Sequence, residues 1–236
     1  MNALAKVRLV LMRPRNPENL GAVARVMKNF GLSSWSLVDP RTHDFHAARR
    51  VAVHSEEILD RPAMAGSLDE AVADSSWVVG TSSRSIPGVP VFAPRELAAQ
   101  MAERARSGQD VALVFGDERS GLTNDEVARC HALSRVPVEP EQPSINLAQS
   151  VALYAYELHL AAAEAPPAAE RPSATDAQLA QLEARLGEAL ALAKFLDPEN
   201  PRHALRDLAR AWQRAQLSPR EWRLWMAAAS ALAKGR

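Results

Sequence analysis

The sequence predicts an α/β fold in which helices cover both faces of a parallel sheet, followed by a small C-terminal helical domain. Short apolar runs of strand length alternate with segments of helical periodicity through the first two thirds of the 236-residue chain. A stretch with three prolines and no periodicity, residues 165–175, then precedes three predicted helices. We therefore expect a first domain over residues 1–164, a linker over 165–175 and a helical domain over 176–236.

Five short, mostly apolar runs have the length of strands. They are residues 7–12, 35–38, 77–80, 111–115 and 136–138. A predicted helix joins the first two, so this β–α–β unit implies a parallel pair with a crossover helix. No run leads into G-x-G-x-x-G, so a dinucleotide-binding Rossmann domain is poorly supported.

The predicted helices are marked by apolar spacing and by capping residues. One face of the first helix carries Leu20, Val23, Met27 and Phe30. Gly31 then ends this helix, and Ser/Thr-x-x-Glu capping boxes begin at Ser67, Thr123 and Ser218. The expected helices span residues 20–30, 67–73, 94–106, 123–130, 144–163, 176–195, 201–216 and 219–233, with a broken helix over 43–60.

Composition narrows the class of protein. Cys130 is the single cysteine, so the chain cannot form an internal disulfide, and a reducing compartment is the default. No signal peptide is recognisable, and no apolar segment reaches the roughly 20 residues that span a bilayer, so we expect a cytoplasmic protein without a membrane partner. The histidines have no metal-binding spacing with a cysteine pair, and we expect no metal.

The net charge is zero but unevenly spread. Residues 1–30 carry six Lys/Arg against one acid, and residues 202–236 carry eight against two. Arginines recur every fourth residue along one face of a predicted helix, at Arg202, Arg206, Arg210 and Arg214. Such a stripe suits a nucleic-acid backbone, although a solvated helix face that only aids solubility would have the same pattern.

Three sequence blocks follow predicted strands and open predicted helices. They are Asn19-x-Gly21-x-x-x-Arg25 ending in Phe30–Gly31, then Phe115–Gly116-x-Glu118-x-x-Gly121–Leu122, then Pro143–Ser144–Ile145–Asn146–Leu147–Ala148. Their order and spacing resemble the three motifs of the SPOUT class of RNA methyltransferases, in its SpoU/TrmH branch. The sequence GTSSRS at residues 80–85 and the appended helices extend the resemblance to members of this branch that modify tRNA.

The resemblance implies S-adenosyl-L-methionine as the cofactor, tRNA as the partner and an obligate homodimer. It also implies a trefoil knot in the C-terminal part of the sheet domain, which neither composition nor periodicity predicts. The implied reaction is 2′-O-ribose methylation at cytidine or uridine 32 of the anticodon loop. Two alternatives stay open: an rRNA 2′-O-methyltransferase of the same branch, and a non-catalytic RNA-binding protein with this fold.

The resemblance also assigns catalytic residues, each with a simpler explanation. Arg25 is permanently charged and a poor general base, so we expect it to bind phosphate and orient the ribose hydroxyl, unless it is only a solvated helix arginine. Asn19 and Asn146 lie at helix starts and could be caps alone. Glu118 is expected to organise the motif loops and the substrate end of the pocket, and a simple ion pair to Arg119 or Arg84 would be compatible with that role. Ser144 completes the expected set.

The expected cofactor-binding residues are Thr81, Ser82, Ser83, Gly116, Val136, Pro143, Ser144 and Ile145. The expected RNA-binding residues are Arg84, Arg202, Arg206, Arg210 and Arg214. Two positions depart from the pattern. Asp117 stands where a basic residue is expected, which puts an RNA contact by that side chain in doubt. Pro143 stands where a small hydroxyl residue is common, and it has no N–H to donate.

Overall fold

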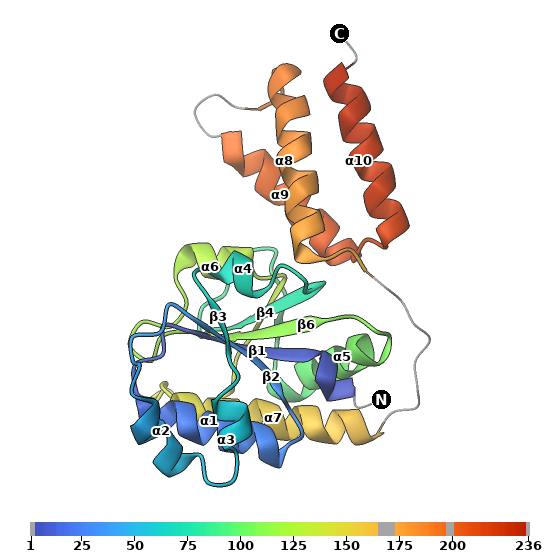
Figure 1. The fold of residues 1–236 in the computed structure, drawn as a ribbon. Coiled ribbons are helices and arrows are strands. Elements are labelled where there is room, and N and C mark those ends of the chain that lie inside the picture. The colour runs from blue at the N-terminus through green and yellow to red at the C-terminus, as the bar shows by residue number, and fades with distance from the viewer. Residues whose placement is uncertain (1–2, 165–172, 197–200, 235–236) are drawn as a thin grey trace.

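A seven-stranded parallel sheet forms the centre of the protein in the computed structural model, which describes residues 3–164, 173–196 and 201–234 (Figure 1). The strands are β1 (Val7–Met12), β2 (Ser34–Val38), β3 (Ala63–Ala65), β4 (Trp77–Thr81), β5 (Val91–Phe92), β6 (Val111–Phe115) and β7 (Ala132–Ser134). Their order is β3-β2-β1-β6-β4-β7-β5, and every pair is parallel. The predicted α/β class with a parallel sheet is confirmed.

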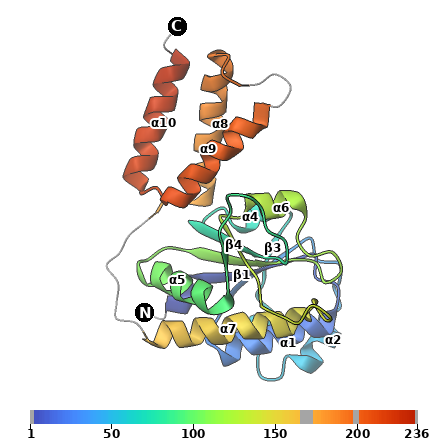
Figure 2. The same ribbon diagram turned by 180° about the vertical axis from the view of Figure 1, so that it is seen from behind.

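Helices cover both faces of the sheet, as predicted. The bounds are a 3₁₀ helix Ala3–Lys6, α1 (Pro17–Asn29), α2 (Phe45–Val51), α3 (Glu56–Leu59), α4 (Leu68–Ala71), α5 (Pro94–Arg106), α6 (Asn124–Arg129) and α7 (Leu147–Glu164). Helices α1, α5 and α7 lie along one face, and α4 and α6 lie on the other (Figures 1 and 2). Each face has its own apolar core, centred on residues such as Leu11 and Phe115 on one side and Val10 and Val114 on the other.

One predicted strand is wrong. Residues 136–138 form no strand, and the last central strand is β7, four residues earlier. Pro137 lacks the N–H that a ladder requires, and Val138 is exposed, so this apolar run does not pair. The short strands β3 and β5 were not predicted, because two or three residues carry too little periodicity to be recognised.

Helix boundaries differ in a few places for local reasons. Helix α1 begins at Pro17, earlier than predicted, because the Asn16 side chain caps it by accepting the Glu18 N–H at 2.8 Å. Gly31, with φ of 75°, follows its end as expected. The helix predicted over residues 67–73 is shorter, ending at Ala71, and the segment 43–60 is indeed broken into α2 and α3.

Three further helices follow the sheet domain: α8 (Asp176–Leu192), α9 (Pro201–Ala215) and α10 (Pro219–Lys234). They enclose a separate apolar cluster that includes Leu182, Leu186 and Trp212. Most of the expected linker, residues 165–172, lies outside the described residues. Among the described residues, no helix combines the length and apolar character needed to cross a bilayer.

Candidate active site

A cavity of about 580 Å³ opens at the carboxyl ends of β4, β6 and β7. Its walls are the loops that follow these strands, residues 81–84, 115–122 and 134–138, together with residues 143–145 and the first turns of α7. Ligands of open parallel sheets bind at this edge, because the strands end there and the loops diverge. The cavity is therefore the candidate active site.

All eight residues expected to bind the cofactor line this cavity. They are Thr81, Ser82, Ser83, Gly116, Val136, Pro143, Ser144 and Ile145. They come from four separate segments, and the fold brings together residues that lie up to 64 positions apart in the sequence. Thr81 donates its hydroxyl to the Val114 carbonyl at 3.0 Å, which ties the ends of β4 and β6 together below the cavity.

The loop after β6 turns sharply, and its glycines permit the turn. A Cβ at Gly116 would lie 2.2 Å from the carbonyl carbon of Gly121, which no side chain can tolerate. Gly121 has φ of 66°, in the left-handed region. The N–H of each of Asp117 and Gly121 donates to the other's carbonyl, at 3.1 and 2.8 Å, and these two bonds close the loop.

Asp117 has a structural role in this loop. Its carboxylate is buried and accepts the N–H groups of Arg119 at 2.8 Å and Ser120 at 3.2 Å, and the Arg15 Nε at 2.8 Å. Burial alone would raise the pKa of Asp117, but the hydrogen bonds from Arg119, Arg15 and Ser120 outweigh it and hold the pKa below its ordinary value. The doubt about an RNA contact by this side chain is justified, because the carboxylate faces inward.

Glu118 joins the first and second sequence blocks. Its carboxylate accepts the backbone N–H of Arg15 at 3.0 and 3.1 Å, the backbone N–H of Asn16 at 3.2 Å and the side-chain amide of Asn19 at 3.3 Å. Among the described residues Glu118 forms no ion pair with Arg119 or Arg84; its partners are the Arg15 and Asn16 backbone and the Asn19 side chain.

Asn19 and Asn146 join the first and third blocks. The Asn146 amide donates to Asn19 Oδ1 at 3.1 Å, and its own Oδ1 accepts the N–H groups of Ala148 and Gln149 at the start of α7. Asn146 is therefore a helix cap as well as a link. Asn19 is not a cap, because Asn16 fills that position, and it is buried between its two partners. Glu118, Asn19 and Asn146 thus connect all three blocks beside the cavity.

Arg25 lies apart from this network. It is exposed on α1, it does not line the cavity, and within the described part of the chain it has no hydrogen bond or ion pair. A single chain therefore does not bring Arg25 to the expected site.

Arg84, which was expected to bind RNA, instead makes hydrogen bonds within the protein. Its guanidinium donates to the Asn124 side chain and the Leu122 carbonyl.

Two residues at the cavity floor were missed by sequence reasoning. Tyr154 donates its hydroxyl to Ser134 Oγ at 2.9 Å, and Ser134 donates to the Phe92 carbonyl at 2.9 Å. Burial raises the pKa of Tyr154 to about 12. In the sequence, Tyr154 cannot be distinguished from a core residue, because it lies on the apolar face of α7. Only its hydrogen-bond partner Ser134 on β7 reveals that its hydroxyl has a polar role.

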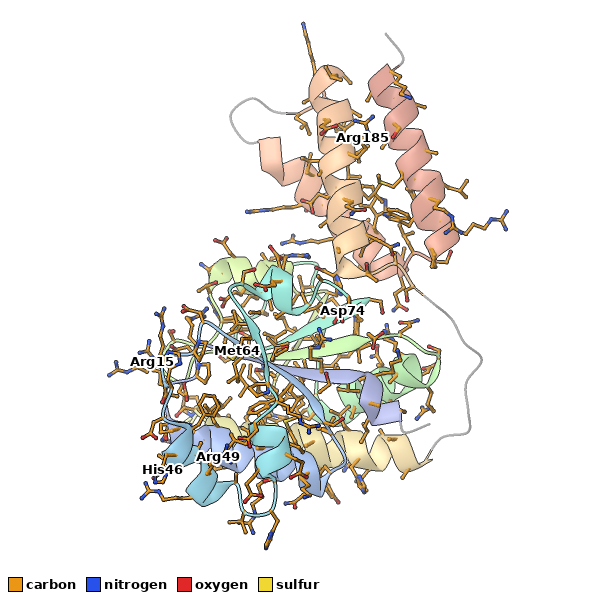
Figure 3. All side chains as sticks on the ribbon, viewed as in Figure 1. Arg15, His46, Arg49, Met64, Asp74 and Arg185 are labelled. Carbon is orange, nitrogen blue, oxygen red and sulfur yellow. The ribbon has the colours of Figure 1, made fainter. Side chains whose placement is uncertain are left out.

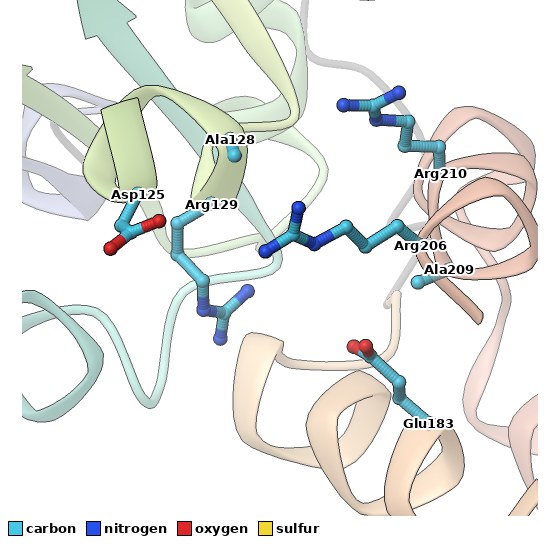
Figure 4. A pocket seen from close by; sticks show the side chains of 7 residues that line it. All are labelled: Asp125, Ala128, Arg129, Glu183, Arg206, Ala209 and Arg210. Atoms are coloured by element: carbon cyan, nitrogen blue, oxygen red, sulfur yellow. The ribbon is translucent and has the colours of Figure 1, made fainter. Parts of the chain in front are cut away.

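A second cavity, of about 270 Å³, lies between α6 and the C-terminal helices (Figure 4). Arg206 and Arg210 of the predicted stripe line it, together with Arg129 from the sheet domain and the acids Asp125 and Glu183. Further along the stripe, Arg214 Nη1 reaches the Gly88 carbonyl at 3.4 Å. The Arg202 side chain lies outside the described residues. At least half of the stripe therefore faces the sheet domain.

The two parts of the protein meet at a buried carboxylate. Asp176, at the start of α8, pairs with Arg129, and Asp176 Oδ1 lies 3.5 Å from His131 Nε2. His131 Nδ1 accepts the Val78 N–H at 2.7 Å, so the proton of a neutral ring lies on Nε2 and faces Asp176. Burial alone would lower the pKa of Arg129, but the charges of Asp176 and Asp69 raise it. No three or more His, Cys, Asp or Glu side chains in the described ranges are grouped to hold a metal.

Comparison with known proteins agrees with this geometry. Residues 6–156 match the model of the SpoU rRNA Methylase family, which covers the sheet domain and all three sequence blocks. The chain belongs to the SpoU methylase family. The family match ends before α8, so the C-terminal helices have to be compared through individual relatives.

The SpoU methylase relatives include proteins that match along nearly the whole chain. The tRNA (cytidine/uridine/adenosine-2′-O-)-methyltransferase TrmJ of Pseudomonas aeruginosa is 38% identical over 92% of this chain and 90% of its own length. The crystal structure of TrmJ from Z. mobilis superposes with a TM-score of 0.81 at 30% identity, over 95% of this chain and 98% of that one. An AdoMet-bound rRNA methyltransferase from Sinorhizobium meliloti matches 65% of this chain and 56% of its own, with a TM-score of 0.50 and 25% identity.

Proposed function

We propose that this protein is an S-adenosyl-L-methionine-dependent tRNA 2′-O-ribose methyltransferase that acts at cytidine or uridine 32 of the anticodon loop. The observation that carries the proposal is the junction of Glu118, Asn19 and Asn146, which links the three blocks beside a cavity at the carboxyl edge of the sheet. The relatives that match 92% of the chain are tRNA 2′-O-methyltransferases by name.

The cavity suits an adenosine-containing cofactor. The lining combines the hydroxyl residues Thr81 and Ser82 with the apolar residues Val136 and Ile145, a mixture that suits a ligand with a polar ribose and a flat base. Gly116 lets the loop after β6 fold tightly against Gly121 and Leu122, which shapes this wall of the cavity. When bound, S-adenosyl-L-methionine supplies an activated methyl group and a neutral leaving group.

The protein's part in such a transfer is positioning. The ribose hydroxyl must be held in line with the methyl group, and orientation of two bound reactants supplies a large share of a rate enhancement. We assign Ser144 and Asn146 to the side of the site where the hydroxyl enters. Glu118 holds the loop of residues 15–19 against the cavity through its hydrogen bonds. Arg25 is assigned to the phosphate beside the methylated ribose.

A homodimer resolves the separation of Arg25 from the cavity of its own chain. Leu153 and Tyr156 on α7 are exposed, and Tyr156 packs edge-on against Phe30, which immediately follows α1. This apolar surface lies on the same pair of helices as Arg25, so we propose that it pairs with a second copy and completes the site. We also propose that residues 135–146 are threaded into a trefoil knot. Arg135 of this segment binds the Ser83 carbonyl of the loop it would pass.

The C-terminal helices are proposed to form a domain over residues 176–236 that binds the body of the tRNA. Arg206 and Arg210 reach the cavity between the two domains, where a phosphate backbone could meet them and Arg129 (Figure 4). Neutralising both stripe arginines, in Arg206→Gln with Arg210→Gln, should lower the salt dependence of tRNA binding by about one to two units of slope. An unchanged slope would show that these two arginines do not contact the phosphate backbone.

The decisive experiment is transfer of labelled methyl from S-adenosyl-L-methionine to unmodified tRNA, followed by nucleoside analysis. We expect 2′-O-methylcytidine or 2′-O-methyluridine, and a tRNA with deoxyribose at position 32 should accept no label. Label on ribosomal RNA alone would favour the rRNA enzyme of the same family. Binding of tRNA without any label would favour a non-catalytic protein, against which the complete set of Arg25, Glu118, Ser144 and Asn146 argues.

A further inference from the structure

Arg15 is held at two points beside the cavity. Its backbone N–H donates to the Glu118 carboxylate at 3.0 and 3.1 Å, and its side-chain Nε donates to Asp117 Oδ2 at 2.8 Å. Both partners line the cavity. A surface arginine loses conformational entropy when it binds a ligand, because its rotatable bonds become fixed. In Arg15 the contacts to Glu118 and Asp117 already fix much of that conformation, so less entropy is lost on binding.

The rest of the guanidinium is free to bind a ligand. The Arg15 side chain is 43% exposed, and its terminal nitrogens have no hydrogen-bond partner within the described part of the chain. Figure 3 shows this side chain at the outer edge of the sheet domain. A guanidinium whose Nε is occupied still presents its two terminal groups, which together match two oxygens of a phosphate.

Asp117 fixes the direction of Arg15. Its side chain is 1% exposed and is itself held by the N–H groups of Arg119 and Ser120. A carboxylate so constrained cannot swing with its partner, so it acts as a rigid support for the arginine rather than as a surface ion pair. This arrangement differs from Arg13, whose two terminal nitrogens each donate to the Glu126 carboxylate, at 2.5 and 2.9 Å.

We propose that Arg15 binds a backbone phosphate of the RNA substrate at the mouth of the cavity, and that Asp117 is the positioning residue that aims it. The inference rests on the proposed function, because it assumes that the cavity receives an RNA strand. It adds an RNA contact close to the methylated ribose, separate from Arg25 and from the arginine stripe on α9. A phosphate at this point would fix the strand relative to Glu118 and the start of α1.

The test compares Arg15→Ala with Lys6→Ala. Lys6 is a matched control, because its side chain is 44% exposed and forms one ion pair with Asp110 at the opposite, amino-terminal edge of the sheet. We expect Arg15→Ala to raise the KM for tRNA about 10-fold and to lower the salt slope of tRNA binding by about one unit. Affinity for S-adenosylhomocysteine should stay within about twofold, and Lys6→Ala should change none of these values.

The variant Asp117→Asn tests the orientation of the Arg15 guanidinium separately from its positive charge. This variant keeps all positive charges, so we expect the salt slope to be retained while kcat/KM for tRNA falls. The Arg15→Ala, Asp117→Asn double variant should then be no worse than Arg15→Ala alone. Unchanged tRNA binding in Arg15→Ala overturns the proposal. If Arg15→Ala also loses cofactor affinity and thermal stability, the proposal is overturned as well, because Arg15 then only stabilises the loop. Absence of methyl transfer in the unsubstituted protein refutes the proposed function instead.

Discussion

Replacement of Asp176 by asparagine tests how the C-terminal helices are held to the sheet domain. The Asp176 side chain is 1% exposed and pairs with Arg129, which is 24% exposed. Two backbone bonds cross the same boundary, from Asp176 N–H to the Ser75 carbonyl at 2.6 Å and from Ala177 N–H to the Ala73 carbonyl at 3.1 Å. The substitution removes the charge and leaves these bonds and the side-chain shape in place.

The expected loss is about 1–2 kcal/mol of docking free energy. Breaking a fully buried ion pair costs about 3–5 kcal/mol. The loss here is smaller for two reasons: Arg129 keeps its bond to the Asp69 carboxylate, and an asparagine oxygen can still accept a hydrogen bond. A change of this size raises the undocked population about 5–30-fold.

Two dyes on the two domains would measure this population. Lys6→Cys and Lys234→Cys provide exposed attachment sites, and the native Cys130 is buried and should stay unlabelled. Energy transfer should broaden in Asp176→Asn. The control is Asp69→Asn, which removes the other partner of Arg129, 71% exposed, and should cost at most about 0.5 kcal/mol. Equal effects of the two substitutions, or none from either, would refute the reasoning.

Three other changes test the sheet domain. Arg25→Ala should abolish methyl transfer and leave cofactor affinity within a few-fold, as measured by turnover and calorimetry, and loss of cofactor binding would show that Arg25 is misplaced. Gly116→Ala should abolish S-adenosylhomocysteine binding, because its Cβ would lie 2.2 Å from the Gly121 backbone. Burial would raise the pKa values of Asp117 and Glu126, but hydrogen bonds from Arg15, Arg13 and backbone N–H groups hold both below their ordinary values. Their stabilisation is therefore complete above about pH 5 and is lost as pH falls through the folded-state values, so melting temperatures should drop on acidification and drop less in Glu126→Gln.

Helices and strands were predicted correctly from the sequence where capping residues or apolar runs mark them locally. Helix α5 has the predicted bounds because a proline at its first position and a glycine after its end mark both termini. Strand β6 was identified because five apolar residues in succession are all buried. Residues 136–138 were misassigned because apolarity was weighed without the missing N–H of Pro137. Strand β7, Ala132–Ser134, has too little apolar bulk to be recognised before its neighbours are known.

The candidate site was predictable as a set of segments but not as a set of contacts. Motif spacing identified the loops that line the cavity, including Gly116 and Ser144. It could not reveal that Asn16, rather than Asn19, caps α1, because both residues have the same chemistry and lie within one turn. It also gave no signal for Arg15, whose partner Asp117 is more than a hundred residues away.

The bond between Asn19 and Asn146 has a consequence for how the protein acquires its ligand site during folding. These residues are separated by 127 positions, and the Asn19–Glu118 contact by 99. The cavity cannot form until β7 and α7, the last strand and helix of the sheet domain, have joined the same fold as β1 and α1. Contacts between residues so far apart in sequence form slowly, so the protein should acquire the ability to bind its ligand late in folding. A ligand that fills the cavity then favours only the completed domain, and at a concentration 100-fold above its Kd it would add about 2.7 kcal/mol to the free energy of unfolding.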